Sequence, residues 1–175
     1  MEVAAAGRED GPMELRPATA ADFPFLMEML LEACNWDGTP WYDEAKVRRD
    51  DHAWRYLDGW PAATDFGVVA EVDGSPAGAT WARLLMSERR GYGYVADDVP
   101  ELTLGVAAGF RRRGVGRGLL TEVIAQARAA SYRRLSLSVD PDNPARKLYE
   151  SLGFRKVGVV GTSDTMVLEL QPPAV

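Results

Sequence analysis

Apolar residues recur at regular spacings in eleven stretches of the chain, and each stretch predicts one helix or strand. The clearest helix covers residues 115–127, where apolar side chains fall on one face at spacings of three and four. The clearest strand covers residues 101–107, where Leu102, Leu104 and Val106 alternate with other residues. The predicted strands are residues 14–19, 66–72, 77–86, 101–107, 135–139, 154–160 and 165–170. The predicted helices are residues 23–34, 43–58, 115–127 and 143–152.

Turn residues between these stretches predict how neighbouring strands connect. Asp73 and Gly74 separate two strands and indicate a hairpin, with Ser75 and Pro76 lengthening its loop. The last two strands form a second hairpin in the same way. Pro17 stops the first strand and favours a place at the edge of a sheet, because proline cannot donate to a strand ladder.

The order of the elements, β-α-α-β-β-β-α-β-α-β-β, predicts the fold class. It favours an α/β (α+β) fold in which helices cover both faces of a mixed sheet. Neither repeats nor low-complexity tracts divide the sequence, so we expect one domain over residues 13–175. Residues 1–12 are polar and aperiodic, and we expect them to be a disordered tail.

Composition excludes several classes of protein. Hydrophobic residues make up 46% of the 175 and charged residues 26%, as in soluble globular domains. The apolar runs are too short to cross a membrane, which needs about 20 residues. With one cysteine, Cys34, and one histidine, His52, we expect neither a disulfide framework nor a metal site. The first residues lack the layout of a signal peptide, which favours a cytoplasmic location.

Charge is distributed unevenly along the chain. The formal net charge is −6, yet residues 108–156 hold 11 basic and four acidic residues, a local charge of +7. A basic block in an acidic protein favours a localised anionic ligand over a nucleic acid, which usually meets a wide basic face. A solvated arginine-rich helix surface is the alternative, and charge alone does not separate the two.

The basic block begins with a glycine-rich turn between a strand and a helix. Its pattern is Arg111-x-x-Gly114-x-Gly116, and Arg112, Arg113 and Arg117 add further positive charge. Glycine lets a ligand approach the backbone closely, while the N–H groups and dipole of a helix N-terminus attract anions. This turn therefore predicts a diphosphate site. It lacks the G-x-x-x-x-G-K-[ST] pattern of nucleoside triphosphatases and the G-x-G-x-x-G pattern of dinucleotide folds.

Arg111-x-x-Gly114-x-Gly116 resembles the [QR]-x-x-G-x-[GA] pyrophosphate loop of the GNAT superfamily of N-acetyltransferases. Residues 142–154, DNPARKLYESLGF, are similar to that family's N-x-x-A-x-x-L-Y-x-x-x-G-F motif. The opening LRPAT and the helix after it match its usual first strand and helix. The resemblance covers about residue 13 to the C-terminus. It implies a mostly antiparallel sheet of about seven strands with about four helices.

The resemblance also implies a binding mode for acetyl-CoA as co-substrate. Leu104 and Val106 would pair with the pantetheine arm through their backbones, in a V between strands 101–107 and 135–139. Asn143 lies six residues before Tyr149, where the family pattern gives seven. Either this loop is one residue shorter, or Asn143 is not the asparagine that bonds the pantetheine. The implied cofactor-binding residues are Leu104, Gly105, Val106, Arg111, Arg112, Arg113, Gly114, Val115, Gly116, Arg117, Gly118, Asn143 and Arg146.

Two residues are candidates for proton transfer. Tyr149 would protonate the departing thiolate according to the family motif, whereas its spacing within residues 145–152 fits a packing role. Glu101 would accept the proton of the amine, since a half-buried carboxylate can have a raised pKa. Its alternative is a solvated acid at a strand end. Asp97, Asp98 and Glu101 together could hold a cationic amine.

The reaction implied by the resemblance is direct transfer of an acetyl group to a primary amine in a ternary complex. The alternative is a non-catalytic acyl-CoA-binding domain of the same fold. The acceptor would be a small-molecule or peptide amine, and neither a nucleic acid nor a membrane is expected as partner; a homodimer is possible. Four of the five tryptophans fall between residues 36 and 60, where they would line an acceptor pocket or pack in the core or a dimer.

Overall fold

The computed structural model describes residues 11–170, and residues 1–10 of the predicted tail lie outside this range. Seven strands form one sheet in the order β1-β2-β3-β4-β5-β7-β6. All neighbouring strands are antiparallel except β4 and β5, which are parallel. The strands are β1 (Met13–Pro17), β2 (Phe66–Val72), β3 (Ser75–Arg83), β4 (Glu101–Val106), β5 (Arg134–Val139), β6 (Arg155–Val160) and β7 (Ser163–Glu169).

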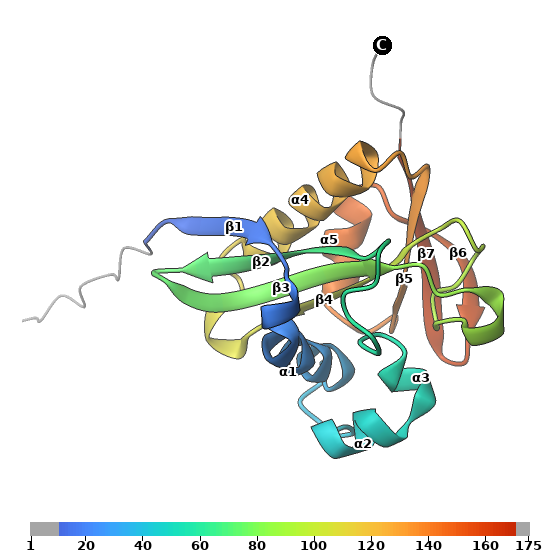
Figure 1. Cartoon of the computed structure of the whole chain (residues 1–175), viewed down its shortest axis with the longest axis horizontal. Helices are drawn as coiled ribbons and strands as arrows, with labels where there is room; N and C mark the ends of the chain where they lie inside the picture. The colour runs from blue at the N-terminus through green and yellow to red at the C-terminus, as the bar shows by residue number, and fades with distance from the viewer. Residues whose placement is uncertain (1–10, 171–175) are drawn as a thin grey trace, which may run out of the picture.

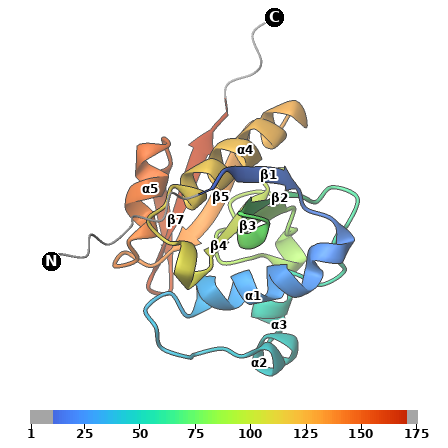
Figure 2. The same ribbon diagram turned by 90° about the vertical axis from the view of Figure 1, so that its left-hand side faces the viewer.

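The helices cover both faces of this sheet (Figures 1 and 2). One face holds the longest helix and the short helix before β6, and the other holds the remaining three (Figure 1). The helices are α1 (Phe23–Cys34), α2 (Glu44–Arg49), α3 (Asp51–Trp54), α4 (Val115–Ala129) and α5 (Ala145–Ser151). The predicted fold class is therefore confirmed. None of the helices within residues 11–170 has the length and apolar character to span a membrane.

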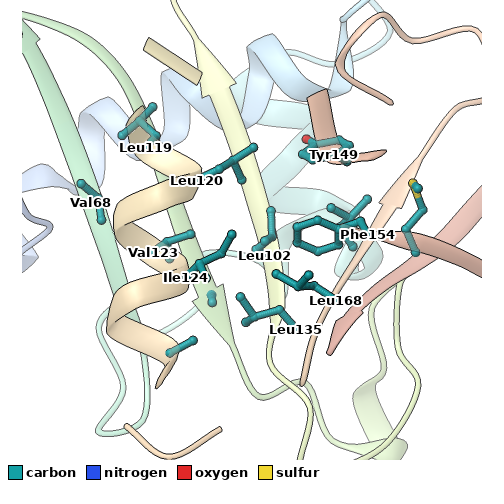
Figure 3. Close-up of a cluster of buried hydrophobic side chains, with 14 of the residues drawn as sticks. Val68, Leu102, Leu119, Leu120, Val123, Ile124, Leu135, Tyr149, Phe154 and Leu168 are labelled. Atoms are coloured by element: carbon teal, nitrogen blue, oxygen red, sulfur yellow. The ribbon is translucent and has the colours of Figure 1, made fainter. Parts of the chain in front are cut away.

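The sheet has a hydrophobic core on each face, and successive residues of β2 point alternately into the two cores. Val68 and Ala70 face α4, and Val69 between them packs with α1 on the opposite side. Figure 3 shows the first of these cores, with the apolar stripe of α4 packed on β2, β3 and β4, and with Tyr149 and Phe154 in the same cluster. The helical spacing read over residues 115–127 is thus the buried face of α4.

Two local predictions were wrong. The helix predicted over residues 43–58 ends at Arg49, because Asp50 leaves the helical conformation and caps α3 by accepting from the His52 N–H (2.9 Å). Ser75 and Pro76 belong to β3 and not to the preceding loop. Asp73 and Gly74 both have positive φ, 52° and 74°, so the hairpin closes with a two-residue type I′ turn.

Candidate active site

Strands β4 and β5 part soon after they meet. Their only paired residues are Glu101 and Ser136, next to a bond from the Ser136 N–H to the Pro100 carbonyl (3.0 Å). Beyond that point a cleft of about 800 Å³ opens between residues 102–106 of β4 and 137–139 of β5. The cleft runs from Glu101 to the N-terminus of α4. The V predicted between these strands is present as a cavity.

The N-terminus of α4 forms one end of the cleft. Gly114 is the residue before the helix, with φ 80°, and its carbonyl accepts the first intrahelical bond from the Gly118 N–H (3.1 Å). The N–H groups of residues 115–117 precede that bond and have no intrahelical acceptor. Gly114 and Gly116 both line the cleft, where a Cβ on Gly116 would come within 3.1 Å of Leu148. This end of the cleft can therefore hold an anion.

Three of the predicted arginines border the cleft at the same turn. The Arg111 guanidinium donates to Glu32 of α1 (2.6 Å), and Arg117 donates to the Ser151 hydroxyl (2.9 Å). Arg112 lines the cleft between them with a positive φ of 60°. Positive charge thus surrounds the N-terminus of α4.

Three other predicted cofactor-binding residues lie away from the cleft. The Arg113 guanidinium stacks over a neighbouring phenylalanine ring, 5.1 Å from its centroid. Gly118 faces β1, where a Cβ would lie 2.6 Å from the Met13 side chain. Arg146 is turned towards β7 by an ion pair with Asp164. The remaining ten, including Asn143, line the cleft; Asn143 Oδ1 also accepts from the Ala145 N–H (3.0 Å) at the start of α5.

Glu101 lies at the other end of the cleft and is 3% exposed. Its Oε1 accepts from the Tyr56 hydroxyl (2.6 Å) and from the Gly93 N–H (2.8 Å). Its Oε2 is buried with no hydrogen-bond partner among residues 11–170. Burial raises the pKa of Glu101 to about 7, although the bonds from Tyr56 and Gly93 oppose that rise. A carboxyl with this pKa gains and loses a proton near neutrality.

The solvated alternative for Glu101 was wrong, and Asp97 and Asp98 do not line the cleft with it. The Asp97 carboxylate accepts from the Tyr94 hydroxyl and the Ser87 N–H, both at 2.8 Å. The Asp98 side chain is 79% exposed beside Arg134. Glu101 is therefore the one buried carboxylate of the three.

The sequence interpretation missed the residues that hold Glu101. Tyr56 donates to it from beyond the end of α3 and accepts from the Tyr92 N–H (2.8 Å). Glycines flank Tyr92, and at Gly93 a Cβ would lie 2.5 Å from the backbone of Leu137 in β5. The pattern Gly-Tyr-Gly-Tyr before an acid-led strand was the available signal, because paired glycines indicate a close backbone approach.

Tyr149 lies in the same cleft, with its ring packed against Phe154 (centroids 5.8 Å apart; Figure 3). Burial raises the pKa of its hydroxyl above the usual value of 10, so the group stays protonated at neutral pH. The Tyr149 hydroxyl makes no hydrogen bond to another side chain or backbone group of the described chain. Tyr149 thus packs against Phe154 and also lines the cleft, so both of its expected roles fit its position.

The whole of this region matches a known family. Residues 28–154 fit the model of the acetyltransferase (GNAT) family. The chain belongs to the GNAT family of acetyltransferases. The resemblance read from the glycine-arginine turn and the second motif is confirmed.

Individual GNAT relatives extend the comparison. Phosphinothricin N-acetyltransferase of Streptomyces viridochromogenes is 26% identical over 163 residues, which cover 87% of this chain and 79% of that enzyme. A structure of ribosomal-protein-alanine N-acetyltransferase from Brucella melitensis has a TM-score of 0.65 at 25% identity, covering 90% of this chain and 99% of that one. YncA of Salmonella typhimurium, solved with its cofactor acetyl-CoA, has a TM-score of 0.68 at 22% identity, covering 94% and 98%.

The tryptophans of this GNAT domain divide between several roles. Trp36 lines the cleft, whereas Trp41 is 59% exposed and faces solvent. Trp54 packs edge-on against a phenylalanine ring of α1. Trp60 and Trp81 are buried, and their indole N–H groups donate to backbone carbonyls. Only one of the four early tryptophans therefore borders the candidate site.

No group of three or more metal-ligating side chains occurs in the described part of the chain.

Proposed function

We propose that the chain transfers an acetyl group from acetyl-CoA to a primary amine by direct attack within a ternary complex. The observation that carries this proposal is the continuity of the cleft. One cavity joins an anion site at the α4 N-terminus to a buried carboxyl with a pKa of about 7. Acetyl-CoA presents a diphosphate at one end of a long arm and a thioester at the other.

The residues at the α4 end fit the diphosphate. The N–H groups of residues 115–117 supply hydrogen bonds, and Arg112 and Arg117 supply charge-assisted donors. The glycines at 114 and 116 keep Cβ atoms out of this turn. Leu104, Gly105 and Val106 then line the path towards Glu101, where their backbones can pair with the pantetheine arm.

Glu101 is proposed to take the proton that the amine must lose. Its Oε2 is buried without a partner in the described chain, so it can receive that proton directly or through a water molecule. Its raised pKa makes the carboxylate a stronger base than an exposed glutamate while leaving it half ionised near pH 7.

Tyr149 is proposed to protonate the departing thiolate. Replacing Tyr149 by phenylalanine should lower kcat about 100-fold, because the general acid is lost while the ring still packs on Phe154. The KM for acetyl-CoA should change little. The matched control is Tyr132→Phe, since that ring stacks on Phe66 at a distance of 5.6 Å outside the cleft. A kcat within twofold of the wild type would leave Tyr149 with packing alone.

Ligand-dependent unfolding tests the proposal as a whole. Acetyl-CoA or CoA at 100 times its Kd should stabilise the chain by about 2.7 kcal/mol. For a domain of this size that raises Tm by roughly 5–10 °C, while NAD and ATP should raise it much less.

The Arg112→Gln variant should bind acetyl-CoA about tenfold more weakly, as expected for a lost charge-assisted bond. Arg133→Gln, an exposed arginine outside the cleft, is the control.

If binding is seen, release of free thiol with a panel of primary amines tests the transfer itself. An equal Tm with and without acetyl-CoA would overturn the proposal. Binding without thiol release on any amine would support the non-catalytic alternative.

A further inference from the structure

Aromatic side chains gather where the cleft reaches Glu101. Trp36, Tyr42, Tyr56 and Tyr92 all line the cleft, with Cys34 and Ala53, and the Tyr56 hydroxyl bonds to both Glu101 and the Tyr92 N–H. They come from four segments of the chain: the end of α1, the loop before α2, the end of α3 and the loop before β4. Such a wall offers the faces of aromatic rings and an apolar surface to a ligand.

Hydrogen bonds fix Tyr42 in this wall at both its ends. The Asn35 side chain bonds to both the carbonyl (2.8 Å) and the N–H (3.0 Å) of Tyr42. The Tyr42 hydroxyl donates to Asp50 at 2.7 Å. Burial and Asp50 both raise the pKa of this hydroxyl. The ring is thus held in place before any ligand binds.

Tyr92 is held from two sides as well. Its N–H donates to the Tyr56 hydroxyl, and its ring lies against His52 with centroids 5.8 Å apart. Burial raises the pKa of Tyr92, with Asp50 and Cys34 contributing to the rise. Tyr42, Tyr92, Cys34 and Asp50 therefore lie close enough to influence one another.

The cations nearest this wall have partners of their own. The Lys46 ammonium lies over the Tyr42 ring, 4.4 Å from its centroid, and donates to the Trp41 carbonyl (2.6 Å). The Arg55 guanidinium is 7% exposed and is taken up by Asp51 and the Arg90 carbonyl. Arg89 is paired with Asp51 and Asp58. The cationic residues found in the cleft lining belong to the turn at the α4 end.

The lining of the acceptor end is aromatic, and two acids contact it. Asp50 and Glu101 are its acids, and both face groups of the wall. A carboxylate entering here would lose its water beside these two acids, while the nearest cations are already paired, which is strongly unfavourable. An ammonium group meets the opposite conditions, since ring faces and nearby acids attract a cation.

We propose that the acceptor is a primary amine carried on an uncharged aromatic or apolar body, with no anionic group on the molecule. This inference rests on the proposed acetyl transfer. The ammonium group is drawn past the rings to Glu101, where it loses a proton, and the rest of the molecule packs against Tyr42, Tyr92 and Trp36. Amino acids are excluded as acceptors because of the carboxylate beside the amine.

Three amines that share one carbon skeleton test this with the full chain and acetyl-CoA. They are phenethylamine, L-phenylalanine amide and L-phenylalanine, and the readout is kcat/KM from thiol release. Phenethylamine and the amide should exceed phenylalanine by at least about 100-fold, because only the amino acid carries the anion. A difference below tenfold between the amide and the acid would overturn the inference.

Two further amines test the aromatic body. Spermidine has primary amines without rings, and phosphinothricin is an anionic amino acid. A higher kcat/KM for either than for phenethylamine would overturn the inference while leaving acetyl transfer intact. If acetyl-CoA raises Tm but none of the amines releases thiol, the transfer reaction itself fails and the inference fails with it.

Variants of the wall separate acceptor binding from folding and from cofactor binding. Tyr92→Ala and Tyr42→Ala should each raise the KM for phenethylamine about tenfold and leave the KM for acetyl-CoA within twofold. Trp41→Ala is the matched control, because that exposed ring lies outside the cleft. Unchanged KM values for phenethylamine in both tyrosine variants, with Tm preserved, would overturn the assignment of this wall.

Discussion

Replacing Glu101 by glutamine is expected to lower kcat by about 10²- to 10³-fold, the range lost with a general base. Glutamine keeps the shape of the side chain and can still accept from Tyr56 and Gly93 through its oxygen. It cannot take a proton from the amine. Stopped assays of thiol release at saturating acetyl-CoA and amine measure the effect, and an unchanged Tm shift with acetyl-CoA shows that the cofactor end is intact.

The pH dependence of kcat distinguishes a base from a merely structural acid. Because burial raises the pKa of Glu101 to about 7, the carboxylate is protonated and inactive below that pH. In the wild type kcat should therefore rise with pH through about 7 and then level off, whereas the Glu101→Gln variant should lack this rise. A wild-type profile without a rise near pH 7 would contradict the assignment.

If Glu101 is the base, Tyr56 acts on the reaction through it, as a positioning residue. Its hydroxyl stabilises the ionised carboxylate, so the Tyr56→Phe substitution should raise the pKa of Glu101 further. The rise in kcat then moves to higher pH by about one unit, a shift that corresponds to the loss of one such bond. Activity lost at pH 7 returns at higher pH, which simple damage to the fold would not produce.

Local sequence patterns predicted most of the helices and strands. Period-2 alternation located β4, and the stripe from Val115 to Ala127 located α4, because these periods reflect burial directly. The turn residues Asp73 and Gly74 indicated the hairpin of β2 and β3. The break at Asp50 was missed, since an aspartate inside a polar helical stretch and an aspartate that caps a new helix have the same local sequence. The family resemblance gave a mostly antiparallel sheet of about seven strands, and no local pattern predicted their order in the sheet, because pairing joins segments distant in the sequence.

The two ends of the site differ in how far sequence reveals them. The turn with Gly114 and Gly116 is contiguous along the chain, so its chemistry could be predicted from seven residues. Glu101 depends on Tyr56, 45 positions earlier, and this pair forms only when the segment after α3 lies against the start of β4. The motif also predicted Arg146 near the cofactor, yet Asp164 turns its side chain towards β7. Position in a motif does not fix the direction of a long side chain.

A buried ion pair connects this site to the stability of the chain. Arg83 and Asp65 lie 2.9 Å apart with side chains 7% and 3% exposed. The same guanidinium donates to the carbonyl of Arg55 (3.0 Å), the residue before Tyr56. In the sheet Arg83 lies directly opposite Glu101. The pair therefore anchors the segment that presents Tyr56 to the Glu101 carboxyl.

Replacing Asp65 by asparagine should destabilise the fold by about 3–5 kcal/mol, because it leaves the Arg83 charge buried without a counter-charge. This corresponds to a fall in Tm of roughly 10 °C for a domain of this size. Scanning calorimetry measures it. The control Glu44→Gln removes the pair with Arg48, which lies on the surface, and should barely change Tm.

The paired variant Asp65→Leu/Arg83→Met decides whether charge is the cause. Replacing both partners by apolar side chains removes the unpaired charge, so most of the lost Tm should return. The carbonyl of Arg55 then loses its donor, and kcat should stay below that of the wild type even though the fold is restored. A Tm as low as that of the single variant would show that the unpaired charge of Arg83 is not the cause of the loss.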